Sequence, residues 1–88
     1  MYFAICDDNY MEIRIMENHF SERHIEVDVY ESGEELLVAY KKNEQRYDAV
    51  FIDMEMKGMN GFETAKAIRD IDDTALIAFV TGFVKQTV

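Results

Sequence analysis

Three aspartates stand directly after short apolar runs that are typical of buried strands. Asp7 and Asp8 follow residues 2–6, and Asp53 follows residues 49–52. If both runs are parallel strands of one sheet, the three carboxylates converge at its carboxyl edge. Crowded carboxylates repel and raise one another's pKa, so such a cluster calls for a cation. Oxygen ligands of this kind suit Mg²⁺, which is held by one or two carboxylates together with water and phosphate. The pattern predicts a Mg²⁺ site and phosphate chemistry.

A simpler interpretation is that these aspartates cap helices or turn the chain, because Asp is common after strands for that reason. One cap needs only one oxygen, which leaves Asp7 unexplained when Asp8 is the cap. A third aspartate after a second strand weakens the capping interpretation further. We therefore favour the metal site over the caps.

The composition indicates one small globular domain spanning residues 1–88, with 49% apolar residues. Nine Lys and Arg face eighteen Asp and Glu, a formal net charge of −9. Such a chain repels nucleic-acid backbones and anionic membranes, so neither is an expected partner. No stretch is long enough to span a membrane, and the N-terminus lacks a signal peptide's basic region. The single cysteine, Cys6, is expected to be a buried, unreactive thiol, which fits a reducing cytoplasm.

The order of expected elements is strand, helix, strand, helix, strand, helix, strand. The strands are expected at residues 2–6, 25–30, 48–52 and 76–80. The helices are expected at residues 9–23, after a Ser32–Glu35 capping box, and from Gly61. This alternation predicts a parallel sheet with helices on both faces. The strict polar and apolar alternation of residues 25–30 indicates an edge strand, and the apolar run 48–52 indicates a central one.

The apolar faces of the expected helices follow helical spacing. The side chains expected to be buried are Ile13, Met16 and Phe20 in the first helix, Leu36, Leu37 and Tyr40 in the second, and Phe62, Ala65, Ile68 and Ile71 in the third.

Two more features belong to the same edge of the predicted sheet. Thr81 follows the fourth strand as Asp53 follows the third, and its hydroxyl either contacts a phosphoryl oxygen or caps the next helix. The loop 54–61 follows Asp53 and contains Gly58 and Gly61, which permit tight turns. The backbone carbonyl of Glu55 in this loop could reach a metal beside Asp53.

Taken together, these motifs resemble the receiver domain of bacterial two-component response regulators. The segments that carry the resemblance are residues 3–9 (Phe-Ala-Ile-Cys-Asp-Asp-Asn), residues 51–61 and residues 78–82 (Ala-Phe-Val-Thr-Gly). Their order and spacing fit along the whole chain. The opening segment and the Met-Asn-Gly loop look most like receivers attached to LytTR-type DNA-binding domains. The resemblance implies a flavodoxin-like, doubly wound parallel sheet with ligands at the carboxyl ends of its strands.

The resemblance also implies roles for individual residues. Asp53 matches the phosphoacceptor, which takes a phosphoryl group from a sensor histidine kinase. Asp7 and Asp8 match the acidic pair that helps to bind Mg²⁺, and the Glu55 carbonyl matches a third protein ligand. Thr81 matches the hydroxyl that moves towards the phosphoryl group during switching. Such a domain is a cytoplasmic signalling module that promotes its own phosphorylation, not an enzyme in the usual sense, and its output is expected to be transcriptional.

The sequence departs from the family pattern in two places. Lys57 stands where the family usually has Pro, which is expected to loosen the loop. The chain also ends early, so we expect a truncated sheet of four strands and three helices, without the fifth strand, its phosphoryl-pairing Lys or an output domain. The strand 76–80 would then be an exposed apolar edge. We therefore expect a homodimer or a swapped oligomer.

Two other functions would also use an acidic pocket of this kind. One is a protein-interaction domain that keeps the acidic pocket but does not signal through phosphate. The other is a phosphatase of the haloacid-dehalogenase type, which needs Asp-x-Asp after its first strand. Here Asp7 and Asp8 are followed by Asn9 and Tyr10, which argues against it.

Overall fold

The computed structural model of the chain describes residues 1–42 and 47–80. These residues form four strands and three helices in strict alternation. The elements are β1 (Tyr2–Cys6), α1 (Tyr10–Ser21), β2 (Glu26–Tyr30), α2 (Gly33–Lys42), β3 (Ala49–Asp53), α3 (Gly61–Ile71) and β4 (Ile77–Val80).

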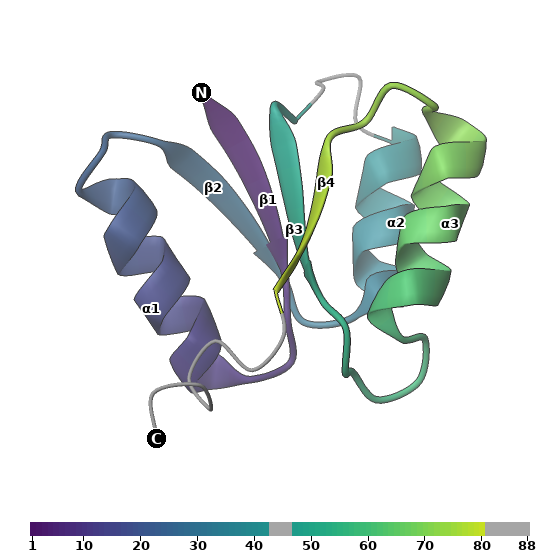
Figure 1. The fold of residues 1–88 in the computed structure, drawn as a ribbon, viewed down its shortest axis with the longest axis horizontal. Helices are drawn as coiled ribbons and strands as arrows, with labels where there is room; N and C mark the ends of the chain where they lie inside the picture. The colour runs from purple at the N-terminus through teal and green to yellow at the C-terminus, as the bar shows by residue number, and fades with distance from the viewer. Residues whose placement is uncertain (43–46, 81–88) are drawn as a thin grey trace.

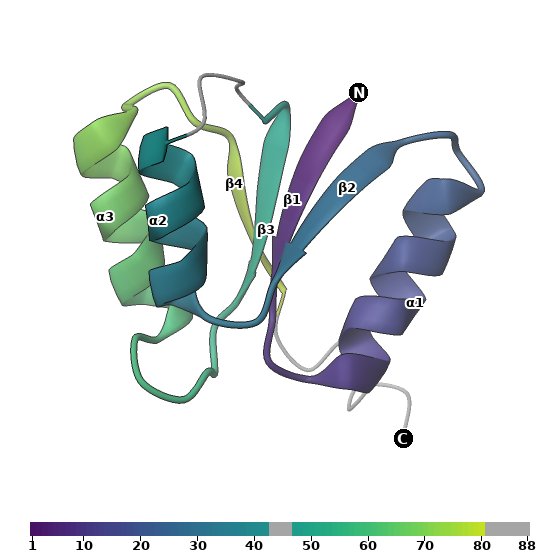
Figure 2. The same cartoon turned by 180° about the vertical axis from the view of Figure 1, so that it is seen from behind.

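The four strands form one parallel sheet in the order β2-β1-β3-β4. Helix α1 lies on one face of the sheet, and α2 and α3 lie on the other (Figure 1, Figure 2). This arrangement confirms the flavodoxin-like, doubly wound class. It also confirms that β2, with its alternating pattern, is an edge strand and that β3, apolar throughout, is internal.

The register of the strands brings their carboxyl ends to one edge of the sheet. Cys6 of β1 pairs with Tyr30 of β2 and with Ile52 of β3, and Asp53 pairs with Val80 of β4. The segments that leave β1 and β3 therefore start side by side, at the lower edge of the sheet in Figure 1.

Alternate side chains of β1 enter two different apolar layers, as the two-residue period of a strand requires. Ala4 and Cys6 pack under α2 and α3 in the main core. On the opposite face, Phe3 meets Phe20 of α1 and Phe51 of β3, with ring centroids 5.0 and 5.2 Å away. Cys6 is fully buried, as expected.

The helix faces agree with most of the predicted burial. Ile13, Met16, Leu36 and Tyr40 are buried, and Phe20 and Leu37 are partly buried. The prediction for α3 was wrong in two places, because Phe62 is 56% exposed and Ile71 is 38% exposed. The stripe that faces the core consists of Gly61, Thr64, Ala65 and Ile68, whose spacing of three and four residues defines one side of the helix. The predicted stripe was therefore rotated on the helix.

Helix starts follow the expected capping chemistry with one change. The Ser32 hydroxyl accepts a hydrogen bond from the Glu35 N–H at 3.1 Å and also lies 3.1 Å from the Glu35 carboxylate. Helix α3 has a full capping box that the sequence analysis did not identify. The Asn60 side chain accepts from the Glu63 N–H at 2.8 Å, and the Glu63 carboxylate accepts from the Asn60 N–H at 3.0 Å.

A cluster of tyrosines surrounds Asp28 on the face covered by α2 and α3. The hydroxyls of Tyr2 and Tyr47 both donate to one oxygen of Asp28, and the Tyr30 and Tyr47 hydroxyls are 2.6 Å apart. Burial and these hydrogen bonds raise the pKa of Tyr47. The tyrosine hydroxyls thus satisfy a partly buried carboxylate.

Candidate functional site: an acidic cluster at the carboxyl edge of the sheet

Asp7 is the innermost carboxylate at this edge. It directly follows β1, and its N–H donates to the Tyr30 carbonyl at the end of β2 (3.0 Å). One carboxylate oxygen, Oδ1, accepts the Asn9 N–H at 2.8 Å. The other, Oδ2, is buried and has no hydrogen-bond partner within the described chain. Helix α1 is capped by Asn9, whose side chain accepts from the Glu12 N–H, so neither Asp7 nor Asp8 is the cap.

Asp53 is the last residue of β3 and is 6% exposed. Its Oδ1 accepts a hydrogen bond from the Glu55 N–H at 3.3 Å. Gly61 lies directly behind it, because a Cβ at position 61 would be 2.3 Å from the Asp53 carbonyl oxygen. The predicted tight turn is confirmed at Gly58, where φ is +74°. At Gly61 glycine is needed for another reason, because there is no room for a Cβ beside the backbone of Asp53.

A third carboxylate, Glu12, completes the cluster. It lies in the first turn of α1 and is 3% exposed. Carboxylate oxygens of Asp7, Glu12 and Asp53 all lie within 4.8 Å of one another, close enough to share one metal ion. Glu12 is not among the site residues predicted from the sequence, because its three-residue spacing from Asn9 is typical of a capping box.

Asp8 is exposed and is not one of the three carboxylates that lie within 4.8 Å of one another. Its Oδ2 accepts a hydrogen bond from the Lys57 N–H at 3.1 Å. A proline at position 57 would have no N–H to donate, so the departure from the family pattern supplies this contact. The backbone of Lys57 therefore ties the loop to Asp8.

The remaining predicted site residues are placed as follows. Glu55 is exposed in the loop after β3, and its N–H points to Asp53. Thr81 lies outside the described residues, directly after β4. Both remain predicted site residues.

Burial dominates the electrostatics of the cluster. It raises the pKa of Asp7 to about 8, and the carboxyls of Glu12 and Asp53 add to this while the Asn9 N–H opposes it. Burial likewise raises the pKa of Asp53, against the lowering effect of the Glu55 N–H. The cluster thus disfavours its own negative charge and would be stabilised by a cation.

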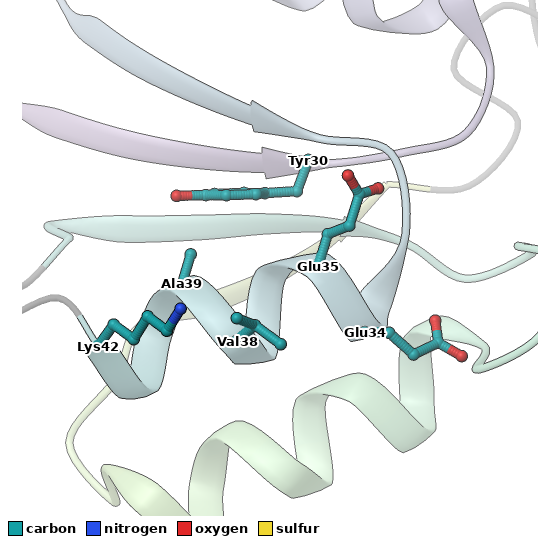
Figure 3. Close-up of a pocket in the computed structure, with 6 residues that line it drawn as sticks. All are labelled: Tyr30, Glu34, Glu35, Val38, Ala39 and Lys42. Atoms are coloured by element: carbon teal, nitrogen blue, oxygen red, sulfur yellow. The ribbon is translucent and has the colours of Figure 1, made fainter.

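A shallow groove lies elsewhere, between the end of β2 and the outer side of α2 (Figure 3). In that view, the ring of Tyr30 lies above the helix. The groove is lined by Tyr30, Glu34, Glu35, Val38, Ala39 and Lys42. None of the three clustered carboxylates lines it, so the groove and the acidic cluster are separate features. None of the described helices is both long and apolar enough to cross a bilayer.

Fold and site together define a small doubly wound α/β domain with a buried acidic cluster where its strands end. The family model for the response regulator receiver domain matches residues 3–88, so the chain belongs to the receiver domain family of two-component signalling. It is a signalling module, as expected.

Curated relatives occur in longer proteins. The chain is 34% identical over 87 residues to the stress response regulator protein 1 of Lodderomyces elongisporus, covering 96% of this chain and 24% of the relative. It is 33% identical over 67 residues to hybrid signal transduction histidine kinase L of Dictyostelium discoideum, covering 75% of this chain and 4% of that protein. The chain thus spans a quarter or less of the length of these two relatives.

Solved structures agree with the fold. The response regulator TrrA of Thermotoga maritima, crystallised in complex with Mg²⁺-BeF, superposes with a TM-score of 0.85 at 31% identity, covering 92% of this chain and 69% of that one. A structure of the histidine kinase ThkA in complex with TrrA matches with a TM-score of 0.81 at 32% identity, covering 93% of this chain and 69% of the matched chain.

Proposed function

We propose that this domain accepts a phosphoryl group on Asp53 from the phosphohistidine of a sensor histidine kinase. The observation that carries the proposal is the position of the Asp53 carboxylate, at the end of β3 and within 4.8 Å of two other buried carboxylates. In the transfer, an ionised Asp53 oxygen forms a bond to phosphorus as the bond from phosphorus to the kinase imidazole nitrogen breaks. The electron pair of that bond stays on the imidazole nitrogen, and the proton on the other ring nitrogen makes the leaving group a neutral histidine. The other product is an aspartyl-phosphate.

Asp53 is held ready for this role by its surroundings. The Glu55 N–H donates to Oδ1 and so fixes the orientation of the carboxylate. The backbone behind it is supported by Gly61, which approaches the Asp53 carbonyl without a side chain. Prepositioning of this kind lowers the entropic cost of an in-line transfer.

The donor set also fits Mg²⁺, because Asp7 has a buried oxygen with no hydrogen-bond partner among the described residues and its carboxylate lies within 4.8 Å of those of Glu12 and Asp53. The residues proposed to hold the ion are Asp7, Asp8 and Asp53 with the Glu55 carbonyl. A bound Mg²⁺ would offset the negative charge of the carboxylates and of the incoming phosphoryl group. The TrrA structure with Mg²⁺-BeF and the ThkA–TrrA complex support the cofactor and the kinase partner as proposals for this chain.

Phosphorylation is proposed to shift a two-state equilibrium in which Thr81 contacts the phosphoryl group. The shift would control an output domain, with transcription as the expected output and the cytoplasm as the expected location. The proposal includes no direct contact of this segment with nucleic acid or membrane, given its net charge of −9.

The test is labelling with acetyl phosphate and Mg²⁺, followed by intact-protein mass spectrometry. The wild-type chain should gain one phosphoryl group, Asp53→Asn should gain none, and labelling should stop when EDTA removes Mg²⁺. Asp70→Asn is the matched control, because Asp70 is an exposed carboxylate of α3. A labelled Asp53→Asn variant would show that another residue is the nucleophile. A folded chain that takes no label would favour the phosphate-independent interaction domain.

A further inference from the structure

Glu12 is an unusual residue for the start of a helix, because its side chain turns inward. Asn9 and Glu12 have the same spacing as Asn60 and Glu63, which form a reciprocal capping box at α3. At α1 the reciprocal bond is replaced, because the Asn9 N–H donates to Asp7 instead. The Glu12 carboxylate is thereby released from capping and lies beside Asp7 and Asp53.

The cost of this placement is high in the absence of a cation. Glutamate is seldom fully buried unless it is paired, and Glu12 is 3% exposed. Its two neighbours in the cluster are the carboxyl groups of Asp7 and Asp53, so the cluster offers Glu12 no basic partner. Independently, the buried Oδ2 of Asp7 has no hydrogen-bond partner in the described chain. A divalent cation at the centre of the three oxygens would satisfy all of them.

We propose that Glu12 is a further residue of the cation site, and that it raises the affinity of the site for divalent ions before phosphorylation. This inference rests on the proposed function, since it assigns one more residue to the same site. A Mg²⁺ site usually uses one or two carboxylates. A third buried carboxylate adds negative charge, which strengthens the attraction of the site for hard divalent cations such as Mg²⁺ and Mn²⁺.

The test compares Glu12→Gln with Glu17→Gln in the 88-residue chain. Gln keeps the size of Glu but removes the charge, and Glu17 is a partly exposed carboxylate farther along the same helix. Mn²⁺ binding is measured by electron paramagnetic resonance and by calorimetry. Glu12→Gln should weaken Mn²⁺ binding about tenfold or more, the effect of losing a metal-site partner. Glu17→Gln should bind as the wild type does.

Heat stability supplies a second readout that does not depend on labelling. Without divalent ions, Glu12→Gln should melt at a higher temperature than the wild type, because one carboxylate of the repelling cluster is gone. At saturating Mn²⁺ the advantage should disappear or reverse, because the wild type gains more from the ion. If Glu12→Gln does not fold, Glu12→Asp, which keeps the charge on a shorter side chain, takes its place and should also bind Mn²⁺ more weakly.

The outcomes separate this inference from the proposed function. Mn²⁺ binding of equal strength in the wild type and Glu12→Gln would overturn the role of Glu12 alone. A wild-type chain that binds no Mn²⁺ and no Mg²⁺ would overturn both this inference and the cation half of the proposed function.

Discussion

Replacing Asp7 by Asn is expected to stabilise the chain in the absence of divalent ions. Asp7 is fully buried, and only one of its oxygens accepts a hydrogen bond in the described chain. Asn would keep the oxygen that accepts from the Asn9 N–H. Its amide group would also offer donors to the neighbouring carboxylates of Glu12 and Asp53, which now face the carboxyl group of Asp7.

The size of the gain follows from the pKa of Asp7. Its ordinary value is 3.8 and burial raises it to about 8, so at neutral pH the folded state holds a proton that the unfolded state releases. Each pKa unit is worth about 1.4 kcal/mol, and roughly three units separate 3.8 from pH 7, which sets an upper limit of about 4 kcal/mol. Relaxation around the cluster lowers this limit, so we expect Asp7→Asn to gain on the order of 2–4 kcal/mol at pH 7.

The pH dependence has a definite sign. When folding raises the pKa of a carboxyl group, its contribution to stability is fully present at pH values below its pKa in the unfolded state. This contribution is lost as the pH rises towards its pKa in the folded state. The advantage of Asp7→Asn over the wild type should therefore shrink on going from about pH 7 to about pH 5, since the unfolded wild type then releases its proton less readily. Other titrating groups are common to both chains and largely cancel in the difference.

The assay is urea unfolding followed by circular dichroism in EDTA buffer at both pH values. Asp70→Asn, on the exposed side of α3, is the control and should change stability by less than about 0.5 kcal/mol. Adding Mg²⁺ should stabilise the wild type and leave Asp7→Asn almost unchanged. Equal stability of Asp7→Asn and the wild type at pH 7, or a gain that does not depend on pH, would refute the reasoning.

Three further changes test the framework around the cluster. Gly61→Ala should cost about 3 kcal/mol and lower the melting temperature, because its Cβ would be 2.3 Å from the backbone oxygen of Asp53; an unchanged melt would contradict this. Lys57→Pro should cost roughly 1–2 kcal/mol in urea unfolding, because it deletes the N–H that donates to Asp8, whereas Lys57→Ala keeps that N–H and should have little effect. Cys6 is fully buried with a pKa raised to about 12, so iodoacetamide should modify it only after unfolding, and rapid modification of the native chain would show that β1 opens readily.

Most of the fold could be predicted from the sequence because its signals were local and agreed with one another. The apolar run of β3 and the alternation of β2 gave their positions in the sheet, and the strand-helix alternation gave the parallel topology. Phe62 was misplaced because hydrophobicity alone does not locate the centre of a helix's buried stripe. The small residues Gly61 and Thr64 occupy that stripe, since they permit close packing against β3 and α2.

The site was predictable in part for a similar reason. Asp7 and Asp53 could be predicted to lie together because Asp7 directly follows β1 and Asp53 is the last residue of β3, and strand register brings these positions side by side. Glu12 was missed because a carboxylate three residues after Asn9 normally serves the helix start. The Asn9 N–H donates to Asp7 instead of to Glu12, and that contact depends on tertiary structure, so the inward position of Glu12 could not be predicted from the sequence.

The tyrosine cluster around Asp28 gives the chain an optical probe of its own. The sequence has five tyrosines and no tryptophan, so intrinsic fluorescence comes from tyrosine alone. Three of these rings, Tyr2, Tyr30 and Tyr47, are joined to one carboxylate or to each other by their hydroxyls, an arrangement that quenches tyrosine emission. Unfolding should therefore brighten the chain by separating the phenols from Asp28. The acidic cluster is built from other residues. Tyrosine fluorescence can therefore follow the packing of α2 and α3 on the sheet with no label or substitution at the residues proposed to bind the ion.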